Sequence, residues 1–341
     1  MDFTPTEAQT EARDLAARVF GDLSTHERLR AAGTGSDPEL WKVLCAAGLV
    51  GAVTDLGLLG LVLLLEEQGR TTAQVPYAAS CVYGLLALAA HGTPEQRDRL
   101  LPALADGSTV VTGAFPAQGA VRASASGELT GVVPVVPWLR DATHVLVADT
   151  ERRLWLAPLG RGADVTAVEL TAPWSAGRLT LDGAPAEPLG GQGAHADVLA
   201  SARTAFAGLQ AGVCAGSLAR AVAHVGGREQ FGRPLATRQA VQLRAADAHM
   251  DTEAIRVTAY EAAWRRDAGL PYATHALTAA WWASEAGQRV VHTGQHLHGG
   301  AGADLDHPVH RHFLWGRQLD AYLGCGPELL EELGELIAHG E

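Results

Sequence analysis

A short segment near residue 228 carries the side chains best suited to hold an anion. The chain runs Gly227-Arg228-Glu229-Gln230-Phe231-Gly232-Arg233-Pro234-Leu235, and Gln239 follows shortly after. A helix that ends at Arg228, before a Gly-Arg-Pro turn, can aim the planar fork of guanidinium donors at a carboxylate or a phosphate. The alternative is a surface arginine at a helix C-terminus, where the helix dipole favours a cation. Spacing alone favours this second interpretation.

A second segment, residues 295–302, has the sequence Gln-His-Leu-His-Gly-Gly-Ala-Gly. Adjacent glycines let a ligand approach the backbone closely, and exposed N–H groups can hold phosphate oxygens. The alternative is an ordinary helix C-cap, for which glycine is the usual residue. Glycine content alone does not decide between the two.

Histidines crowd the same region and raise the question of a metal site. They are His292, His296, His298, His307, His310 and His312. The sequence has no HExxH pair, and carboxylates at ligand spacing are missing. The four cysteines lie far apart without a CxxC pair, which favours reduced thiols over a disulfide framework or a zinc site. We therefore expect no metal.

The charge balance argues against two classes of partner. The chain has 341 residues and a formal net charge of −12, and Lys42 is its only lysine. Proteins that bind nucleic acids or anionic membranes need clustered cations. The N-terminus lacks the basic and apolar regions of a signal peptide, and the apolar stretch 56–65 is too short to span a membrane. We expect a cytoplasmic protein that binds neither nucleic acid nor membrane.

Three stretches of different composition position these segments. Residues 1–107 predict a helical domain, because 37–39 and 93–95 each place an N-cap residue before a proline in the first turn. Residues 108–192 hold short apolar runs between glycine and proline turns, which predicts a β domain. Residues 193–341 are alanine-rich with apolar residues at three- and four-residue spacing, which predicts a helical bundle. The predicted fold class is mostly α with an inserted β domain.

Taken together, these motifs resemble the acyl-CoA dehydrogenase family. The two segments supply Arg228-x-x-Phe231-Gly232 with Gln239, then His298-Gly299-Gly300-x-Gly302 with Pro308 downstream. Residues 64–70 are similar to the family's "EExGR", and residues 96–107 to its "Q…LPxLxxG". The resemblance covers nearly the whole chain. It implies an N-terminal helical domain, a middle β-barrel, a C-terminal four-helix bundle and FAD as cofactor.

The resemblance assigns cofactor contacts to the first segment. It implies that Arg228 reaches across a subunit interface to the FAD pyrophosphate. Phe231 would pack on the cofactor, and Gln239 would hydrogen-bond to it. Gln230 belongs to the same cofactor-binding segment.

The second segment would hold the ADP portion of FAD through Gly299 and Gly300. The family's glutamine stands three residues before the first glycine. This chain has His296 at that position, and Gln295 stands one residue earlier. Either side chain can supply the hydrogen bond.

The chain departs from the family where the family needs its base. Acyl-CoA dehydrogenases abstract the α-proton of a thioester with a glutamate, while hydride leaves the β-carbon for the flavin. The two positions that family glutamates occupy fall on Ala202 and Leu323, and neither side chain can accept a proton. Residues 112–119 correspond to the flavin-covering "TEPxxGSD" loop but lack its acidic and serine positions. The "W-I-T" strand is not recognisable in 132–139, although Trp138 is nearby.

This combination resembles one type of subunit in actinobacterial α2β2 acyl-CoA dehydrogenases. In these heterotetramers one subunit carries the base and most of the flavin pocket, and the other completes the FAD site across the interface. The short length and the ending 296–315 carry this resemblance. It implies a related, longer partner subunit that binds most of the acyl-CoA, with a steroid side-chain thioester among the substrates. It also implies an electron-transfer flavoprotein as acceptor.

Two other functions stay open. The first is a self-sufficient, homo-oligomeric dehydrogenase with a substitute base such as Asp304, Glu261 or a histidine, although each of these is more often a solvated or structural residue. The second is a flavin-free scaffold of this fold. Arg228 and the glycine pair argue against the scaffold, because an unused cofactor interface need not keep phosphate-binding residues.

Overall fold

The computed structural model describes residues 2–115 and 121–339. The chain divides into two compact units, which are described separately. The sheet unit comprises Glu7–Leu61 and Gln74–Ala202, and the bundle unit comprises Met1–Thr6, Val62–Ala73 and Arg203–Glu341. The divisions at 61/62 and 202/203 fall within two helices, α4 (Val53–Thr71) and α8 (Ala194–Gly227).

Short helices with well-defined starts form the first part of the sheet unit. Asp37 caps α3 by accepting from the backbone N–H groups of Glu39 and Leu40. Thr93 and Gln96 form a reciprocal capping box at the start of α7. Both predicted helix starts are confirmed. The helices are α1 (Glu7–Leu23), α2 (His26–Ala32), α3 (Pro38–Ala46), α5 (Tyr77–Ala79), a π-helical segment Ser80–Leu86, α6 (Ala87–His91) and α7 (Pro94–Ala105).

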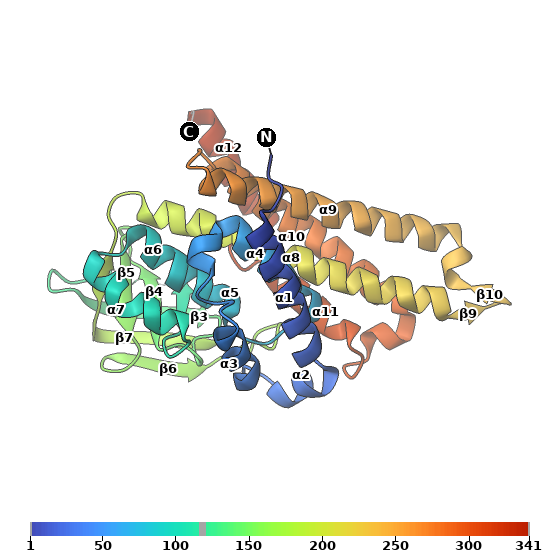
Figure 1. The fold of residues 1–341 in the computed structure, drawn as a ribbon, viewed down its shortest axis with the longest axis horizontal. Helices are drawn as coiled ribbons and strands as arrows, with labels where there is room; N and C mark the ends of the chain where they lie inside the picture. The colour runs from blue at the N-terminus through green and yellow to red at the C-terminus, as the bar shows by residue number, and fades with distance from the viewer. Residues whose placement is uncertain (1, 116–120, 340–341) are drawn as a thin grey trace. The chain divides into compact units, whose positions relative to one another are not determined.

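Two four-stranded sheets follow in the same unit (Figure 1). The first has the order β1 (Val111–Ala114), β4 (His144–Ala148), β5 (Leu154–Pro158), β8 (Glu187–Leu189), with β1 and β4 parallel. The second has the order β2 (Arg122–Ala123), β3 (Glu128–Val136), β7 (Gly177–Pro185), β6 (Ala163–Ala167) and is antiparallel. Val145 and Val147 of the first sheet join Leu129, Leu179 and Leu181 of the second in one buried cluster, so the sheets pack face to face.

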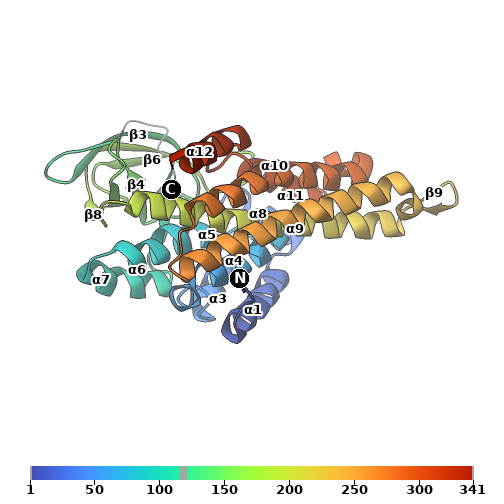
Figure 2. The same ribbon diagram turned by 90° about the horizontal axis from the view of Figure 1, so that it is seen from above.

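Long helices form the bundle unit. α8, α9 (Gln239–Asp267) and α10 (Ala273–His298) run side by side, as Figures 1 and 2 both show. A small hairpin of β9 (Glu229–Gln230) and β10 (Arg233–Pro234) connects α8 to α9 and projects beyond their ends. α11 (Val309–Leu319) and α12 (Gly326–His339) complete the unit, and both contact α10.

Helix α8 is long and apolar enough to pass a membrane-span criterion on length and composition alone. Most of its apolar window is buried inside the protein. A helix that is apolar all round is typical of the core of a large helical protein.

Glycines let α4 and α8 approach almost backbone to backbone. Gly208, Gly212 and Gly216 recur every four residues on α8 and therefore share one face. A Cβ atom at Gly212 would overlap the carbonyl oxygen of Glu66, and one at Gly216 would overlap that of Arg70. Only glycine fits at these two positions.

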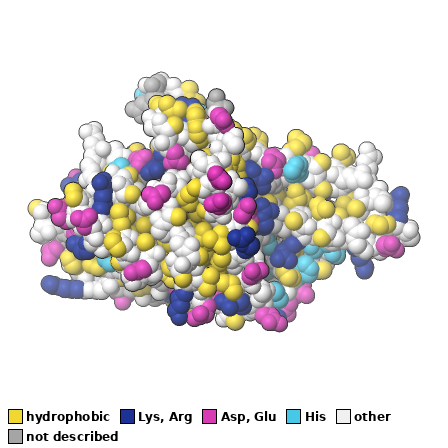
Figure 3. Space-filling model, viewed as in Figure 1, with side chains coloured by type: hydrophobic (Ala, Val, Ile, Leu, Met, Phe, Trp, Pro, Cys, Tyr) yellow, Lys and Arg dark blue, Asp and Glu magenta, His cyan; other side chains and the backbone are white. Residues whose placement is uncertain are grey.

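Acidic and basic side chains are interspersed over the face of the molecule drawn in Figure 3. Apolar side chains lie between them on the same face.

Candidate functional site

The β9–β10 hairpin presents an uncovered aromatic ring. Phe231 and Gly232 occupy the two turn positions with φ of 56° and 77°, as a type I′ hairpin turn requires. The Phe231 side chain is 90% exposed at the tip. The Arg238 guanidinium lies 5.2 Å from the ring centroid, and its Nη2 donates to the carbonyl of Gln230 at 3.4 Å. The hairpin is thus held in shape from its base while the phenylalanine and the Gln230 side chain stay open to solvent.

Arg228 follows the last residue of α8 and is exposed. Its backbone N–H donates to His224 and its carbonyl accepts from Leu235, both at 2.9 Å. Within residues 2–115 and 121–339, its side chain makes no ion pair or hydrogen bond. Its planar set of five N–H donors is therefore available to an external anion.

The structure brings the two glycine-bearing segments together at one end of the bundle. Ala221 and Val225 of α8 pack with Leu297 of α10 in a small buried cluster, and Leu235 and Val241 pack against it. Gln239 is the first residue of α9 and is exposed. In the sequence it lies between Leu235 and Val241. Segments separated by about seventy residues in sequence thus share one surface.

In the glycine loop, residues 299–302, Gly302 packs against the protein, whereas Gly299 and Gly300 are exposed. A Cβ at Gly302 would overlap the carbonyl of Gln295, and the Gln295 amide donates to the carbonyl of Gly302 at 3.1 Å. Gly299 ends α10 with φ of 61°, and a Cβ at Gly299 or Gly300 would meet nothing within 4 Å. Gln295 therefore holds the loop in place, while His296 and the glycine pair face solvent.

These features fit an anionic dinucleotide. The site offers an unpaired guanidinium, open glycine backbone and an uncovered aromatic ring, all on one end of the bundle. Phosphate oxygens suit the first two, and an aromatic face suits the third. No ion pair within the described residues would have to break to admit such a group at Arg228.

Sequence analysis missed two cationic neighbours of this site, Arg220 and His224. They precede Arg228 on α8 at four-residue intervals, so all three share one helix face. That spacing is the signal that identifies them. The His224 ring stacks on His298 with centroids 4.7 Å apart.

The histidines do not assemble into a metal site. His298 contacts His307 edge-on at 4.9 Å, and its Nδ1 donates to the carbonyl of Gly294 at 2.7 Å. Across the described residues, no group of three His, Cys, Asp or Glu side chains converges to hold a metal.

The positions of the family's glutamates are buried and apolar. Ala202 is fully buried in α8, and Leu323 is 6% exposed after α11. In the bundle unit, a cavity of about 20 Å³ is lined by Leu323 and Gly324. This volume holds about one water molecule and excludes a thioester.

Arg203, Phe206 and Tyr322 of the bundle unit are among the side chains that line that cavity. Arg203 donates to both carboxylate oxygens of Glu332 on α12, at 2.8 and 2.7 Å, and its Nε donates to the carbonyl of Leu323 at 3.3 Å. Phe206 meets Tyr322 edge to face at 4.7 Å. The ion pair and the aromatic pair together occupy the space beside Leu323.

Aromatic side chains of the sheet unit are likewise engaged internally. Trp138, the tryptophan nearest to the expected flavin strand, is fully buried and stacks on Trp174 at 4.2 Å. Phe115 stacks between Tyr83 and His195, 5.4 Å from each. Both tryptophan rings are therefore inaccessible to a ligand. Residues 116–119 of the loop that corresponds to "TEPxxGSD" lie outside the described residues.

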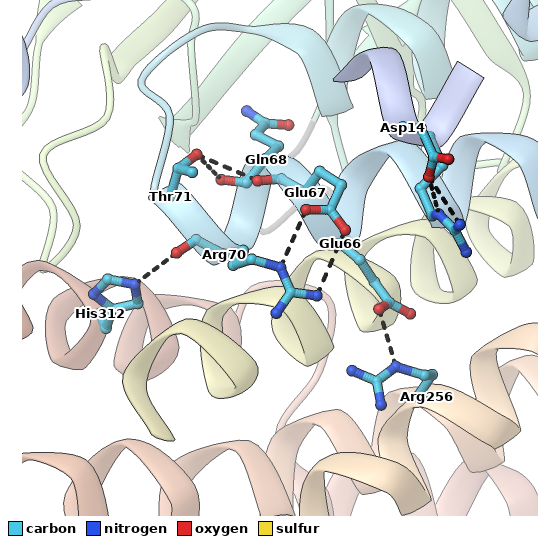
Figure 4. Close-up of polar contacts among 9 residues, drawn as sticks. Asp14, Glu66, Glu67, Gln68, Arg70, Thr71, Arg256 and His312 are labelled. Carbon is cyan, nitrogen blue, oxygen red and sulfur yellow. Dashed lines mark hydrogen bonds and ion pairs between the residues drawn. The ribbon is translucent and has the colours of Figure 1, made fainter. Parts of the chain in front are cut away.

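The "EExGR" segment serves the bundle's packing (Figure 4). Glu66 is buried and pairs with Arg256 of α9 at 3.0 Å. Burial raises the pKa of Glu66, and Arg256 opposes that rise. Glu67 pairs with Arg70 at 3.1 Å, and the carbonyl of Arg70 accepts from Nε2 of His312 at 3.0 Å. The segment thus ties α4 to α9 and α11.

The candidate substitute bases have ordinary structural surroundings. Asp304 is exposed and accepts from the backbone N–H of Asp306 at 3.0 Å. Glu261 lies 3.3 Å from His275 in an ion-pair arrangement. Neither residue lines the cavity beside Leu323.

The fold and the site define a class: a mostly helical protein with two inserted sheets, whose C-terminal bundle has an end with an exposed arginine and exposed glycines. Residues 6–108 match the family described as acyl-CoA dehydrogenase, N-terminal domain, and residues 190–332 match acyl-CoA dehydrogenase, C-terminal domain. The chain belongs to the acyl-CoA dehydrogenase family, whose members are FAD-dependent flavoproteins. The predicted family, fold class and cofactor are confirmed.

Similar proteins extend over nearly the whole chain. Acyl-CoA dehydrogenase FadE27 of Mycobacterium tuberculosis (strain ATCC 25618 / H37Rv) is 34% identical, with 99% of each chain covered. Acyl-CoA dehydrogenase FadE28 of the same organism is 27% identical over 98% of each. Among solved structures, the Tcur3481-Tcur3483 steroid ACAD G363A variant matches with a TM-score of 0.93 and 42% identity over 98% of each chain. The ChsE4-ChsE5 complex from Mycobacterium tuberculosis matches with a TM-score of 0.92 and 33% identity over 99% of each.

Proposed function

We propose that this chain is one subunit of a heteromeric FAD-dependent acyl-CoA dehydrogenase and completes the FAD site of a related, longer subunit. The observation that carries the proposal is the open end of the bundle, where Arg228 has no partner within the described residues and Phe231 is 90% exposed. An aromatic ring that is rigidly held yet uncovered is typical of an anchor at an interface. The similar structures named above include the ChsE4-ChsE5 complex and a steroid ACAD.

In this proposal the partner supplies the catalytic base. FAD, when bound, accepts the hydride that leaves the β-carbon of the acyl-CoA. This chain contributes the Arg228 guanidinium to the diphosphate, Phe231 as packing surface, and the open backbone of Gly299 and Gly300 to the ADP portion. These groups bind and orient, and none of them moves a proton of the substrate.

The closed cavity beside Leu323 supports this division of labour. Ala202 and Leu323 cannot accept a proton, and the cavity of about 20 Å³ leaves no room for a thioester in the bundle unit. A self-sufficient enzyme would need a carboxylate within hydrogen-bond reach of the α-carbon. Glu261 is engaged with His275, and Asp304 lies in an exposed turn, so neither is placed for that role.

Substrate and acceptor follow from the similar proteins. We infer a CoA thioester of a steroid side chain as substrate, because one of the similar structures is described as a steroid ACAD. An electron-transfer flavoprotein is the inferred acceptor, and the cytoplasm is the inferred location.

Purification of the chain alone and together with its related, longer subunit tests the proposal. The candidate partner is the product of a neighbouring gene. We expect flavin absorbance near 450 nm and acyl-CoA dehydrogenation only in the co-purified sample. A yellow, active homo-oligomer would establish the self-sufficient enzyme instead. A colourless protein under both conditions would favour a flavin-free scaffold.

A further inference from the structure

The end of α8 and the residue that follows it carry a group of basic side chains. Arg220, His224 and Arg228 share one face of the helix. Neither arginine makes an ion pair with any residue in the described parts of the chain. Asp304, in the loop after α10, acts electrostatically on His307. The two arginines therefore repel each other unless an external anion binds between them.

His224 is the member of the cluster that is free to change its protonation state. His298 uses its Nδ1 to donate to Gly294, and the Nδ1 of His307 accepts from the backbone N–H of Val309 at 3.2 Å. His224 has a stacking contact with His298, and across residues 2–115 and 121–339 its ring nitrogens have no hydrogen bond. It can gain a proton without breaking a contact.

The charged and titratable groups facing His224 come from three elements. Arg220 lies on its own helix and Arg228 directly after the last residue of that helix. His298 lies on α10, and His307 lies in the loop that follows, where Asp304 acts on it. Burial lowers the pKa of His224, and His298 and Arg228 lower it further. The pKa of His307 is lowered by burial and then by His298, His224 and Arg220, against the opposing effect of Asp304. Burial first, and the neighbouring basic groups second, thus favour the neutral forms of His224 and His307.

We propose that His224 takes up a proton when a diphosphate binds across Arg220 and Arg228, so that this end of the bundle is a proton-coupled anion clamp. The proposal rests on the proposed function in one respect, namely that the diphosphate in the assembled enzyme is that of FAD. A diphosphate would offset the positive charge of Arg228, which adds to the effect of burial in lowering the pKa of His224. The proton comes from solvent, with at most one taken up per site.

The sign of the pH dependence follows from linkage. Because the bound state holds the proton more tightly than the free state, affinity for the diphosphate rises as the pH falls through the bound-state pKa. The gain ends below the free-state pKa. One coupled proton gives at most about a tenfold change in affinity per pH unit.

The first experiment uses the full-length chain labelled with ¹⁵N-histidine and titrated by NMR with and without inorganic pyrophosphate. A His224→Gln variant assigns the His224 signal. We expect pyrophosphate to raise the titration midpoint of His224. Calorimetry in buffers of different ionisation enthalpy should then show net proton uptake that His224→Gln loses. His339→Gln, which removes an exposed histidine at the end of α12, should leave both results unchanged.

An unchanged midpoint in millimolar pyrophosphate, or equal proton uptake in His224→Gln, would overturn the clamp. The co-purified complex separates this result from the proposed function. If the complex is yellow but binds FAD equally well at pH 6.5 and pH 8.0, the clamp is wrong and the proposed function stands. If no partner yields a yellow complex, the proposed function fails, and the pyrophosphate titration still decides the clamp.

A further arm identifies the source of the diphosphate. Coenzyme A also carries a diphosphate. The complex is therefore titrated in parallel with FAD and with coenzyme A. Proton uptake with FAD and none with coenzyme A is the expected result. Uptake with coenzyme A alone would overturn the assignment to FAD.

Discussion

Arg228 and Phe231 combine two features that a folded chain does not usually leave uncovered together. The arginine has no partner within the described residues, and the phenylalanine is held by a turn with two positive φ angles while 90% exposed. An uncovered phenylalanine costs hydrophobic free energy that burial against a partner would recover. At the scale of single residues, these side chains point to an interface.

Replacement of Arg228 by alanine tests the cofactor role of that interface. A charge-assisted hydrogen bond contributes about 1.5–3 kcal/mol, so Arg228→Ala should weaken FAD binding by the complex roughly ten- to a hundredfold. FAD fluorescence titration of the apo-complex measures the dissociation constant. Arg178→Ala, at an exposed position of β7, serves as the control and should leave it unchanged. Equal affinity in wild type and Arg228→Ala would rule out the contact.

His312 should make the stability of the protein pH-dependent. Burial lowers its pKa to about 4, whereas the unfolded chain keeps the ordinary value of 6.5. The unfolded state therefore takes up a proton between pH 6.5 and about 4 that the folded state does not. The free energy of unfolding should fall by up to about 3 kcal/mol as the pH drops through that window and stay level above it.

Urea unfolding of wild type and His312→Gln at pH 7.5 and pH 5 measures this effect. Glutamine keeps an N–H donor for the carbonyl of Arg70 but cannot titrate. The variant should lose less stability than wild type between the two pH values. The same loss in both proteins would assign the acid sensitivity to other groups.

At the scale of elements, the α4–α8 contact depends on the absence of side chains. Gly208, Gly212 and Gly216 leave a smooth strip on α8, and the carbonyls of Glu66 and Arg70 on α4 lie directly against it. This close approach holds the "EExGR" segment where Glu66 can pair with Arg256. The "EExGR" motif on α4 and the glycine strip on α8 therefore pack directly against each other.

A matched pair of substitutions in α8 tests the strip. Gly212→Ala places a methyl group against backbone that cannot move independently, and should cost about 1–3 kcal/mol of stability. Gly226→Ala, near the exposed end of the same helix, meets nothing within 4 Å and should be neutral or stabilising by about 0.5–1 kcal/mol. Thermal and urea denaturation report both. Equal effects of the two substitutions would refute close backbone packing.

For the whole molecule, the proposal assigns chemistry to one subunit and cofactor retention to both. The chain keeps the family fold and the open end of the bundle, while the cavity beside Leu323, lined in part by Arg203, Phe206 and Tyr322, is small. Loss of the base and closure of the cavity are consistent with each other, because an empty, unused pocket would destabilise the bundle.

Restoring a carboxylate should therefore not restore activity. Ala202→Glu and Leu323→Glu place a glutamate at the family's two positions, but the cavity beside Leu323 holds about one water molecule. Anaerobic addition of acyl-CoA to the isolated variants with FAD should leave the flavin absorbance unchanged. Leu323→Gln controls for packing damage, because glutamine is similar in size without the charge. Flavin bleaching in either glutamate variant would contradict this account of the cavity.

The sequence by itself determined features that depend on neighbouring residues or on motif order. The capping residues Asp37 and Thr93 act within one helical turn, so their positions in the sequence sufficed to predict two helix starts. The order of the Arg228 and Gly299 motifs sufficed to predict the family. The short apolar run at 144–148 lies within the predicted β domain and forms β4.

Tertiary structure decided what depends on contacts between distant residues. It decided that His224 lies against His298, that Arg203 pairs with Glu332, and that Gln295 holds the glycine loop while His296 faces solvent. The first two contacts join segments far apart in the sequence, and local pattern carries no information about how such segments pack. Exposure is likewise a property of the folded chain, so only the structure could show that Phe231 is uncovered and Trp138 is not.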